Sequence, residues 1–161
     1  MTGMTSAEDA VRPSTRTEQA ISLAGAQKVA EAVVAAAERR GARLAVVVVD
    51  QRGAQVLVAR MDGASDFALD NATAKARTAV WFRRETADLP GYLRERSALA
   101  AALSARPEIM ASDGGAPLHR AEQVVGGVGA SGASPTVDDE CIAEGVAAFG
   151  RPTTREGTVL T

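Results

Sequence analysis

Lys75 is the residue of this sequence whose setting points most directly to chemistry. The spacing of apolar residues predicts a helix from Asp66 to about Arg84. On that helix Lys75 shares one face with small or apolar residues: Ala68, Ala72, Ala79 and Phe82. A lysine that is partly removed from water gives up its proton more readily or holds an anion. We therefore predict that Lys75 is a catalytic base or binds a carboxylate; alternatively it snorkels to the helix edge, or pairs with Asp62 or Asp113 for structure.

His119 is the only histidine in the chain. It offers the only imidazole for acid–base work near neutral pH or for an axial bond to a haem iron. We therefore include it among the candidate catalytic residues. The alternative is a partly exposed surface residue at the start of a strand.

Arg60 and Asp62 lie at the end of a predicted strand, on either side of Met61. An arginine there could bind a carboxylate through a bidentate fork, and Asp62 could transfer a proton. The alternative is that the two charged residues pair for structure.

A compact turn at Asp113, Gly114 and Gly115 is a candidate ligand-binding loop. Its backbone N–H groups could form a small nest for an anion. The alternative is an ordinary turn. Ser131, in the glycine-rich stretch that follows, is a further candidate ligand-binding residue.

Residues 127–132 read Gly-Val-Gly-Ala-Ser-Gly, which matches the glycine pattern of a dinucleotide-binding turn. Such a turn needs a helix that opens directly from it and a further strand some twenty residues later. Here Ala-Ser-Pro follows Gly132, and the last predicted helix is not followed by a run of β-branched residues that could form the second strand. The glycines therefore indicate a strand that another backbone or a ligand approaches closely.

The last predicted helix, from about Thr136 to Phe149, begins with three acidic residues, Asp138, Asp139 and Glu140. Negative charge in the first turn is favoured by the helix dipole, which accounts for most of their presence. Glu140 and Glu144 lack a third ligand, so no metal site is predicted.

These residues must be positioned by a sheet whose strands are joined through hairpins. Residues 42–50 and 54–62 predict one hairpin, and a short strand near His119 with residues 122–130 predicts another. Helices are predicted from Ser22, from Asp66, around residues 92–103 and from Thr136. The order α-β-β-α-α-β-β-α calls for an α+β fold, an antiparallel sheet with helices packed on it.

Length and composition fit a single soluble domain: 161 residues, of which 46% are apolar and 24% charged. We expect a flexible N-terminal arm over residues 1–17, a domain over 18–150 and a C-terminal tail over 151–161. The net charge of −2 makes nucleic acid a poor partner. No secretory signal or membrane helix is evident, so the expected location is the cytoplasm.

Several stretches together resemble the GlcG/HbpS-like family of haem-binding proteins, which also supplies the C-terminal domain of one class of cobalamin adenosyltransferases. They are VVVVDQRGAQVLVARMDGA, ATAKARTAVWF, DGGAPL, VVGGVGASG and DDECIAEGVAAF, in this order. The resemblance spans residues 20 to 149. One departure is Arg120-Ala121-Glu122, where the family commonly has an Asp-Gly turn.

The resemblance implies a profilin-like α-β-α fold and a homo-oligomer, from dimer to octamer. It also implies a small-ligand-binding protein, with haem possible as the cofactor and no other cofactor expected. The alternative is an enzyme without an organic cofactor, a lyase, dehydratase or isomerase acting on a small carboxylated intermediate. In that case Arg60 would bind the carboxylate, while Lys75 with His119 or Asp62 would move protons.

Overall fold

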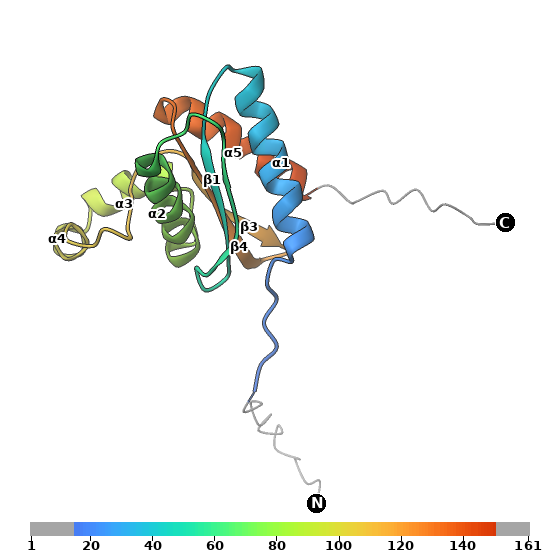
Figure 1. Ribbon diagram of the computed structural model, residues 1–161. Helices are drawn as coiled ribbons and strands as arrows, with labels where there is room; N and C mark the ends of the chain where they lie inside the picture. Colours follow the sequence, from blue (N-terminus) through green and yellow to red (C-terminus); the bar gives the residue numbers. More distant parts are fainter. Residues whose placement is uncertain (1–14, 151–161) are drawn as a thin grey trace, which may run out of the picture.

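The computed structural model describes residues 15–150 and confirms the predicted three-layer arrangement. A four-stranded antiparallel sheet, in the order β2-β1-β4-β3, lies between α1 and α5 on one face and α2 on the other (Figure 1). The main elements are α1 (Leu23–Arg39), β1 (Ala45–Asp50), β2 (Gln55–Arg60), α2 (Asp66–Phe82), β3 (Gly115–Arg120), β4 (Gln123–Ser131) and α5 (Pro135–Gly150).

The connection between α2 and β3 carries shorter elements than the sequence predicts. A 3-10 turn at Thr86–Asp88 is followed by two short helices, α3 (Leu89–Arg94) and α4 (Ser97–Leu103). The sequence predicts one helical stretch here. The chain leaves the helical conformation at Arg96, which has φ −136° and ψ 62° and divides that stretch in two.

Four consecutive valines form the middle of β1, because this strand is buried on both faces. Val46 and Val48 pack in the cluster beneath α1 and α5, while Val47 and Val49 pack in the cluster beneath α2. Alternate side chains of a strand point to opposite faces, so a central strand covered on both sides needs an apolar residue at every position.

The glycines of β4 allow α2 to lie directly on the sheet. A Cβ built at Gly129 would lie 2.1 Å from the carbonyl oxygen of Ala72, and one at Gly127 would lie 2.6 Å from Val80 Cγ2. Neither position therefore tolerates a side chain without movement of α2. The glycine string shapes the contact between sheet and helix, as the sequence indicates.

Serine side chains begin both long N-terminal helices, as predicted. Ser22 Oγ accepts from the N–H of Gly25, and Ser65 Oγ accepts from the N–H of Ala68, each at 3.1 Å. α2 ends at Phe82, because Arg83 takes the left-handed conformation with φ 54° and ψ 40°. A left-handed residue commonly terminates a helix.

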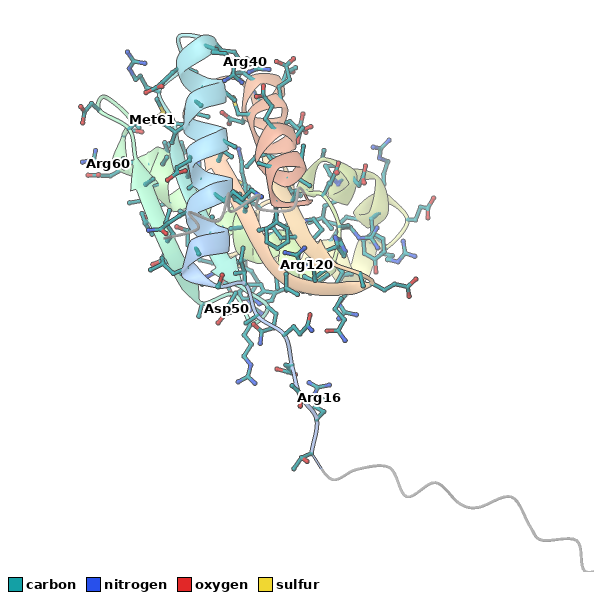
Figure 2. All side chains as sticks on the ribbon, turned by 90° about the vertical axis from the view of Figure 1, so that its right-hand side faces the viewer. Arg16, Arg40, Asp50, Arg60, Met61 and Arg120 are labelled. Carbon is teal, nitrogen blue, oxygen red and sulfur yellow. The ribbon has the colours of Figure 1, made fainter. Side chains whose placement is uncertain are left out.

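An arginine–glutamate network joins α1 to α5 on the outer face of the molecule. Arg40 bonds to Glu140 Oε2 at 3.1 Å and to Glu144 Oε1 at 2.9 Å, and Arg39 also pairs with Glu144. Figure 2 shows Arg40 beside the upper end of both helices. The hydrogen bond from Arg40 lowers the pKa of Glu144 below its usual value. Glu140 and Glu144 are thus each paired with an arginine at the end of α1.

The predicted C-terminal tail, and all but the last residues of the predicted N-terminal arm, lie outside the described residues. Residues 15–22 have no regular structure and are tied to the sheet by a hydrogen bond of 2.7 Å from Ile21 N to Val125 O. Within residues 15–150, no helix is long and apolar enough to cross a membrane. The same residues contain no cluster of three or more metal-binding side chains.

Candidate functional site

Lys75 is buried on the sheet-facing side of α2, where its ammonium group is paired. Only 4% of its side chain is exposed. Nζ donates to the carbonyl oxygen of Ala130 at 3.0 Å and to Asp138 Oδ2 at 3.1 Å. Of the arrangements considered from the sequence, the structure has the buried, paired lysine, but the partner is Asp138 rather than Asp62 or Asp113.

Both carboxylate oxygens of Asp138 accept a hydrogen bond. Its side chain is 3% exposed, and Oδ1 accepts from the N–H of Ala133 at 3.1 Å while Oδ2 faces Lys75. Sequence reasoning assigned this carboxylate to the dipole of α5 and missed its partner. A signal was available: Asp138 begins the stripe that continues through the buried residues Cys141, Ile142 and Gly145.

A cavity of about 420 Å³ opens beside this ion pair. Its walls come from the start of α2, the segment before β3, the end of β4 and the start of α5. The lining residues are Ser65, Phe67, Ala68, Asn71, Lys75, Met110, Ser112, Ser131, Gly132, Ala133, Pro135 and Asp138. We call this space the Lys75 cavity.

The Lys75 cavity combines apolar walls with unused polar groups. An ammonium group has three hydrogens, and Lys75 uses two of them on Ala130 and Asp138. Within residues 15–150, the side chains of Asn71, Ser112 and Ser131 make no hydrogen bond or ion pair. Four polar side chains can therefore turn a donor toward a bound molecule.

The electrostatics of the cavity favour a negatively charged group. The N-termini of α2 and α5 both border it, at Ser65 and Pro135. Backbone N–H groups at a helix N-terminus attract anions. The Lys75–Asp138 pair is neutral as a whole, so the helix ends and the polar donors provide the net attraction.

The Gly114–Gly115 turn lies behind the ion pair rather than open to solvent. A Cβ at Gly114, which has φ +100°, would lie 3.0 Å from Lys75 Nζ and 2.9 Å from Asp138 Cβ. The N–H of Gly114 donates to Asp139 Oδ1 at 3.2 Å. This backbone donor is thus occupied, and the turn closes the back of the site. Asp113 is half-buried and does not line the cavity.

Ser131 is the one other predicted site residue that the structure places in the wall of the Lys75 cavity. Arg60 and Asp62 instead line a separate cavity of about 550 Å³ with Arg43. Arg60 donates to the carbonyl oxygen of Ala64 at 2.8 Å and lies 3.6 Å from Asp66. Figure 2 shows Arg60 and Met61 at the end of β2, next to α1.

His119 also lies away from Lys75. It is exposed near the far end of β3, four residues beyond Gly115, a separation of about 13 Å along the strand. Within one chain, His119, Asp62 and Arg60 are therefore not brought to Lys75.

Sequence reasoning missed other cavity residues besides Asp138. Asn71 and Phe67 lie on the first turns of α2, and Met110 and Ser112 lie before β3. Asn71 lies one helical turn before Lys75, which is the only sequence signal that could have selected it. Burial raises the pKa of the Cys141 thiol, which keeps this residue in its protonated form.

Comparisons with known proteins identify relatives of nearly the whole described chain. A family model described as haem degrading protein HbpS-like matches residues 21–147. A crystal structure of a Streptomyces reticuli HbpS double mutant has 32% identity and a TM-score of 0.78, and covers 91% of this chain and 99% of that chain. The Klebsiella pneumoniae protein ORFY has 28% identity and a TM-score of 0.80, covering 87% and 97%.

A third structure was solved with a bound ligand. The PduOC:heme complex has 28% identity and a TM-score of 0.75, and covers 80% of this chain and 94% of that chain. No curated protein matches the sequence.

Proposed function

This chain belongs to the HbpS-like family, and on that basis we propose that it binds a small carboxylate-bearing molecule in the Lys75 cavity. One observation carries the proposal. An ammonium group that is almost completely buried retains a spare N–H beside a cavity of about 420 Å³, between two helix N-termini. A buried charged donor of this kind gains most from an anion that cannot be replaced by bulk water.

Haem is the carboxylate-bearing candidate that the relatives name, because the PduOC structure is a haem complex. The polar part of the cavity fits a propionate, through Lys75, Ser131 and Asn71. The walls do not fit a histidine-, cysteine- or tyrosine-ligated iron, since the described lining residues include none of these and offer only the Met110 thioether. We therefore derive no chemistry at an iron atom for this chain.

The test measures saturable binding of succinate, acetate and hemin to the purified protein. We expect one of the carboxylates to bind with a stoichiometry of one per chain, and Ser131→Ala with Asn71→Ala to weaken that binding about tenfold. His119→Ala, which alters no residue of the cavity, is the control and should bind as the wild type does. Binding that is unchanged in the cavity variant, or absent for every carboxylate, would contradict the proposal.

Hemin is followed separately by its visible spectrum. A Soret band that saturates at one haem per chain and is lost in the cavity variant would support haem as the ligand. A rise in absorbance that never saturates would remove haem and leave the smaller carboxylates.

A second candidate function is a lyase, dehydratase or isomerase that uses no organic cofactor. The observation that favours it is the Lys75–Asp138 pair itself, an acid and a base at 3.1 Å in the wall of a cavity. Lys75 would transfer the proton, and Asp138 would hold the ammonium in place. If Lys75→Ala left turnover of an identified substrate unchanged, this assignment would be wrong; His119→Ala is expected to retain turnover.

We also propose that the protein forms a homo-oligomer. Among residues 15–150, four large apolar side chains are exposed on the single chain: Leu23, Val58, Phe67 and Trp81, at 44–73%. Burial between subunits would remove these residues from water. Light scattering should give a mass of two to eight chains, and the mass of a single chain would contradict this.

A further inference from the structure

A third cavity lies at the opposite end of β4 from the Lys75 cavity. It has a volume of about 470 Å³ and takes its walls from residues 16–19, the β1–β2 turn, the end of α2 and the start of β4. β4 runs from this cavity at Gln123 to the Lys75 cavity at Ser131, which separates the two by about 27 Å along the strand. We call it the arginine cavity.

Three arginines from three separate segments surround the arginine cavity: Arg16, Arg52 and Arg83. Glu18 is the only acidic side chain among the described lining residues, so these residues carry two net positive charges. Asp50 lies behind the turn, where its carboxylate accepts from the N–H groups of Arg52 and Ala54 at 2.8 and 3.0 Å. It does not line the cavity.

Glu18 pairs with two of the arginines, whose side chains are 84% and 76% exposed, and leaves most of their donors free. Glu18 Oε2 accepts from Arg52 Nη2 at 2.9 Å, and Glu18 Oε1 pairs with Arg16. The hydrogen bond from Arg52 lowers the pKa of Glu18, so this carboxylate stays ionised near neutral pH. A guanidinium has five N–H donors, and most of those on Arg16 and Arg52 are left for another acceptor.

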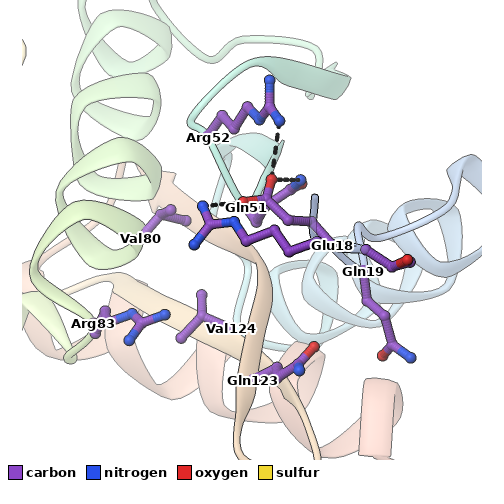
Figure 3. Close-up of a pocket in the computed structure, with 10 residues that line it drawn as sticks. Glu18, Gln19, Gln51, Arg52, Val80, Arg83, Gln123 and Val124 are labelled. Atoms are coloured by element: carbon purple, nitrogen blue, oxygen red, sulfur yellow. Dashed lines mark hydrogen bonds and ion pairs between the residues drawn. The ribbon is translucent and has the colours of Figure 1, made fainter. Parts of the chain in front are cut away.

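Arg83, the residue that directly follows α2, also lines the arginine cavity (Figure 3). Within residues 15–150, its guanidinium has no hydrogen bond or ion pair. Its backbone is left-handed, with φ 54° and ψ 40°, at a helix end where glycine is the usual and least strained residue. A strained backbone that carries an unused arginine into a cavity is a reason to look for a ligand.

Within residues 15–150, Gln51 adds a hydrogen-bond acceptor without a partner, in contrast to the free donors of the arginines. Its Oε1 atom is buried and has no hydrogen-bond partner among the described residues, while its Nε2 lies 3.5 Å from Glu18 Oε2. A buried acceptor without a partner is costly. A negatively charged ligand therefore fits this cavity, and a hydrogen on that ligand would satisfy Gln51 Oε1 once the side chain turns toward the cavity.

We propose that the arginine cavity binds a phosphoryl dianion, either free phosphate or a phosphomonoester, between Arg83 and the Arg16–Glu18–Arg52 cluster. Guanidinium groups bind phosphoryl oxygens through paired hydrogen bonds, and two negative charges match the net charge of the walls. Monohydrogen phosphate also retains one O–H, which can donate to Gln51 Oε1. A phosphomonoester dianion has no P–OH and would be held by the arginines alone. This site is independent of the Lys75 cavity and does not rest on the function proposed for it.

The single tryptophan provides a local reporter for this site. Trp81 Nε1 donates to the carbonyl oxygen of Arg52 at 3.2 Å, so movement of the Arg52 turn changes the surroundings of the indole N–H. We would titrate the full chain with inorganic phosphate and, separately, with glycerol phosphate at constant ionic strength. The indole N–H resonance should shift and saturate with at least one of the two.

The decisive variant is Arg83→Gly, because glycine adopts the left-handed conformation without strain and the fold is retained. It should weaken phosphate binding about tenfold, whereas Arg94→Gln, which removes one exposed arginine of α3 outside the cavity, should change it less than about twofold. No saturable shift with either phosphate compound, or equal weakening in the two variants, would overturn the proposal.

Sulfate tests the assignment of Gln51. It carries two negative charges but no hydrogen to donate, so it should bind at least about threefold more weakly than phosphate at the same pH. Binding of sulfate as tight as that of phosphate would overturn the role given to Gln51 Oε1.

Discussion

Replacement of Lys75 by methionine isolates the role of the buried ion pair. The substitution keeps most of the length of the side chain and removes the charge. Among residues 15–150, the Asp138 carboxylate, which is 3% exposed, is then left with the Ala133 N–H as its one hydrogen-bond donor. Removing one partner of a buried pair costs about 3–5 kcal/mol, because the other charge is left uncompensated. In a chain of this length, that corresponds to a fall in melting temperature of about 6–20 °C.

The assay is urea and thermal unfolding of the single variants, the double variant and a control. Lys75→Met/Asp138→Asn should be about 2 kcal/mol more stable than the sum of the two single changes predicts, since it leaves no unpaired charge. The control Glu31→Gln removes an exposed charge of α1 and should change stability by no more than about 0.5 kcal/mol. A cost below about 1 kcal/mol for Lys75→Met, or strict additivity, would refute the buried pair.

Three further predictions concern the fold. Gly129→Ala places a methyl group 2.1 Å from the Ala72 carbonyl oxygen, so α2 must move, and denaturant unfolding should show a loss of about 3 kcal/mol or more. Ala121 has φ 51° in the β3–β4 turn, so Ala121→Gly should raise stability by about 1 kcal/mol in the same assay. Arg40 lowers the pKa of Glu144, so the stability that this pair contributes is present above the ordinary glutamate pKa and is lost as the pH falls below it. Glu144→Gln should therefore flatten the acid limb of a stability–pH curve; an unchanged limb would contradict this.

The parts of the fold that the sequence predicted are those encoded locally. Ser22 and Ser65 precede apolar periodic runs, and both cap helices as expected. The valine run of β1 can be satisfied only by a strand covered on both faces. The sequence after Gly132 lacks the directly following helix and the second strand that a dinucleotide-binding unit needs, so the glycines do not indicate a nucleotide site.

The pairing within the site depends on tertiary structure that the sequence does not encode locally. Lys75 and Asp138 are 63 residues apart, and the acidic start of α5 has a sufficient local explanation in the helix dipole. The sequence suggests that Arg60 binds a carboxylate beside Lys75. In the sheet, however, β2 lies at the edge farthest from β3, while α2 packs mainly on β4. Strand order, rather than strand identity, therefore decides which charged residues meet.

Binding in the Lys75 cavity can be located by a map of backbone amide shifts during titration with the carboxylate that binds best. We expect the largest shifts at the start of α2 and at residues 131–135, around the Lys75 cavity. Shifts that gather instead around Arg60 and Asp62, or that show no saturation at any site, would contradict it.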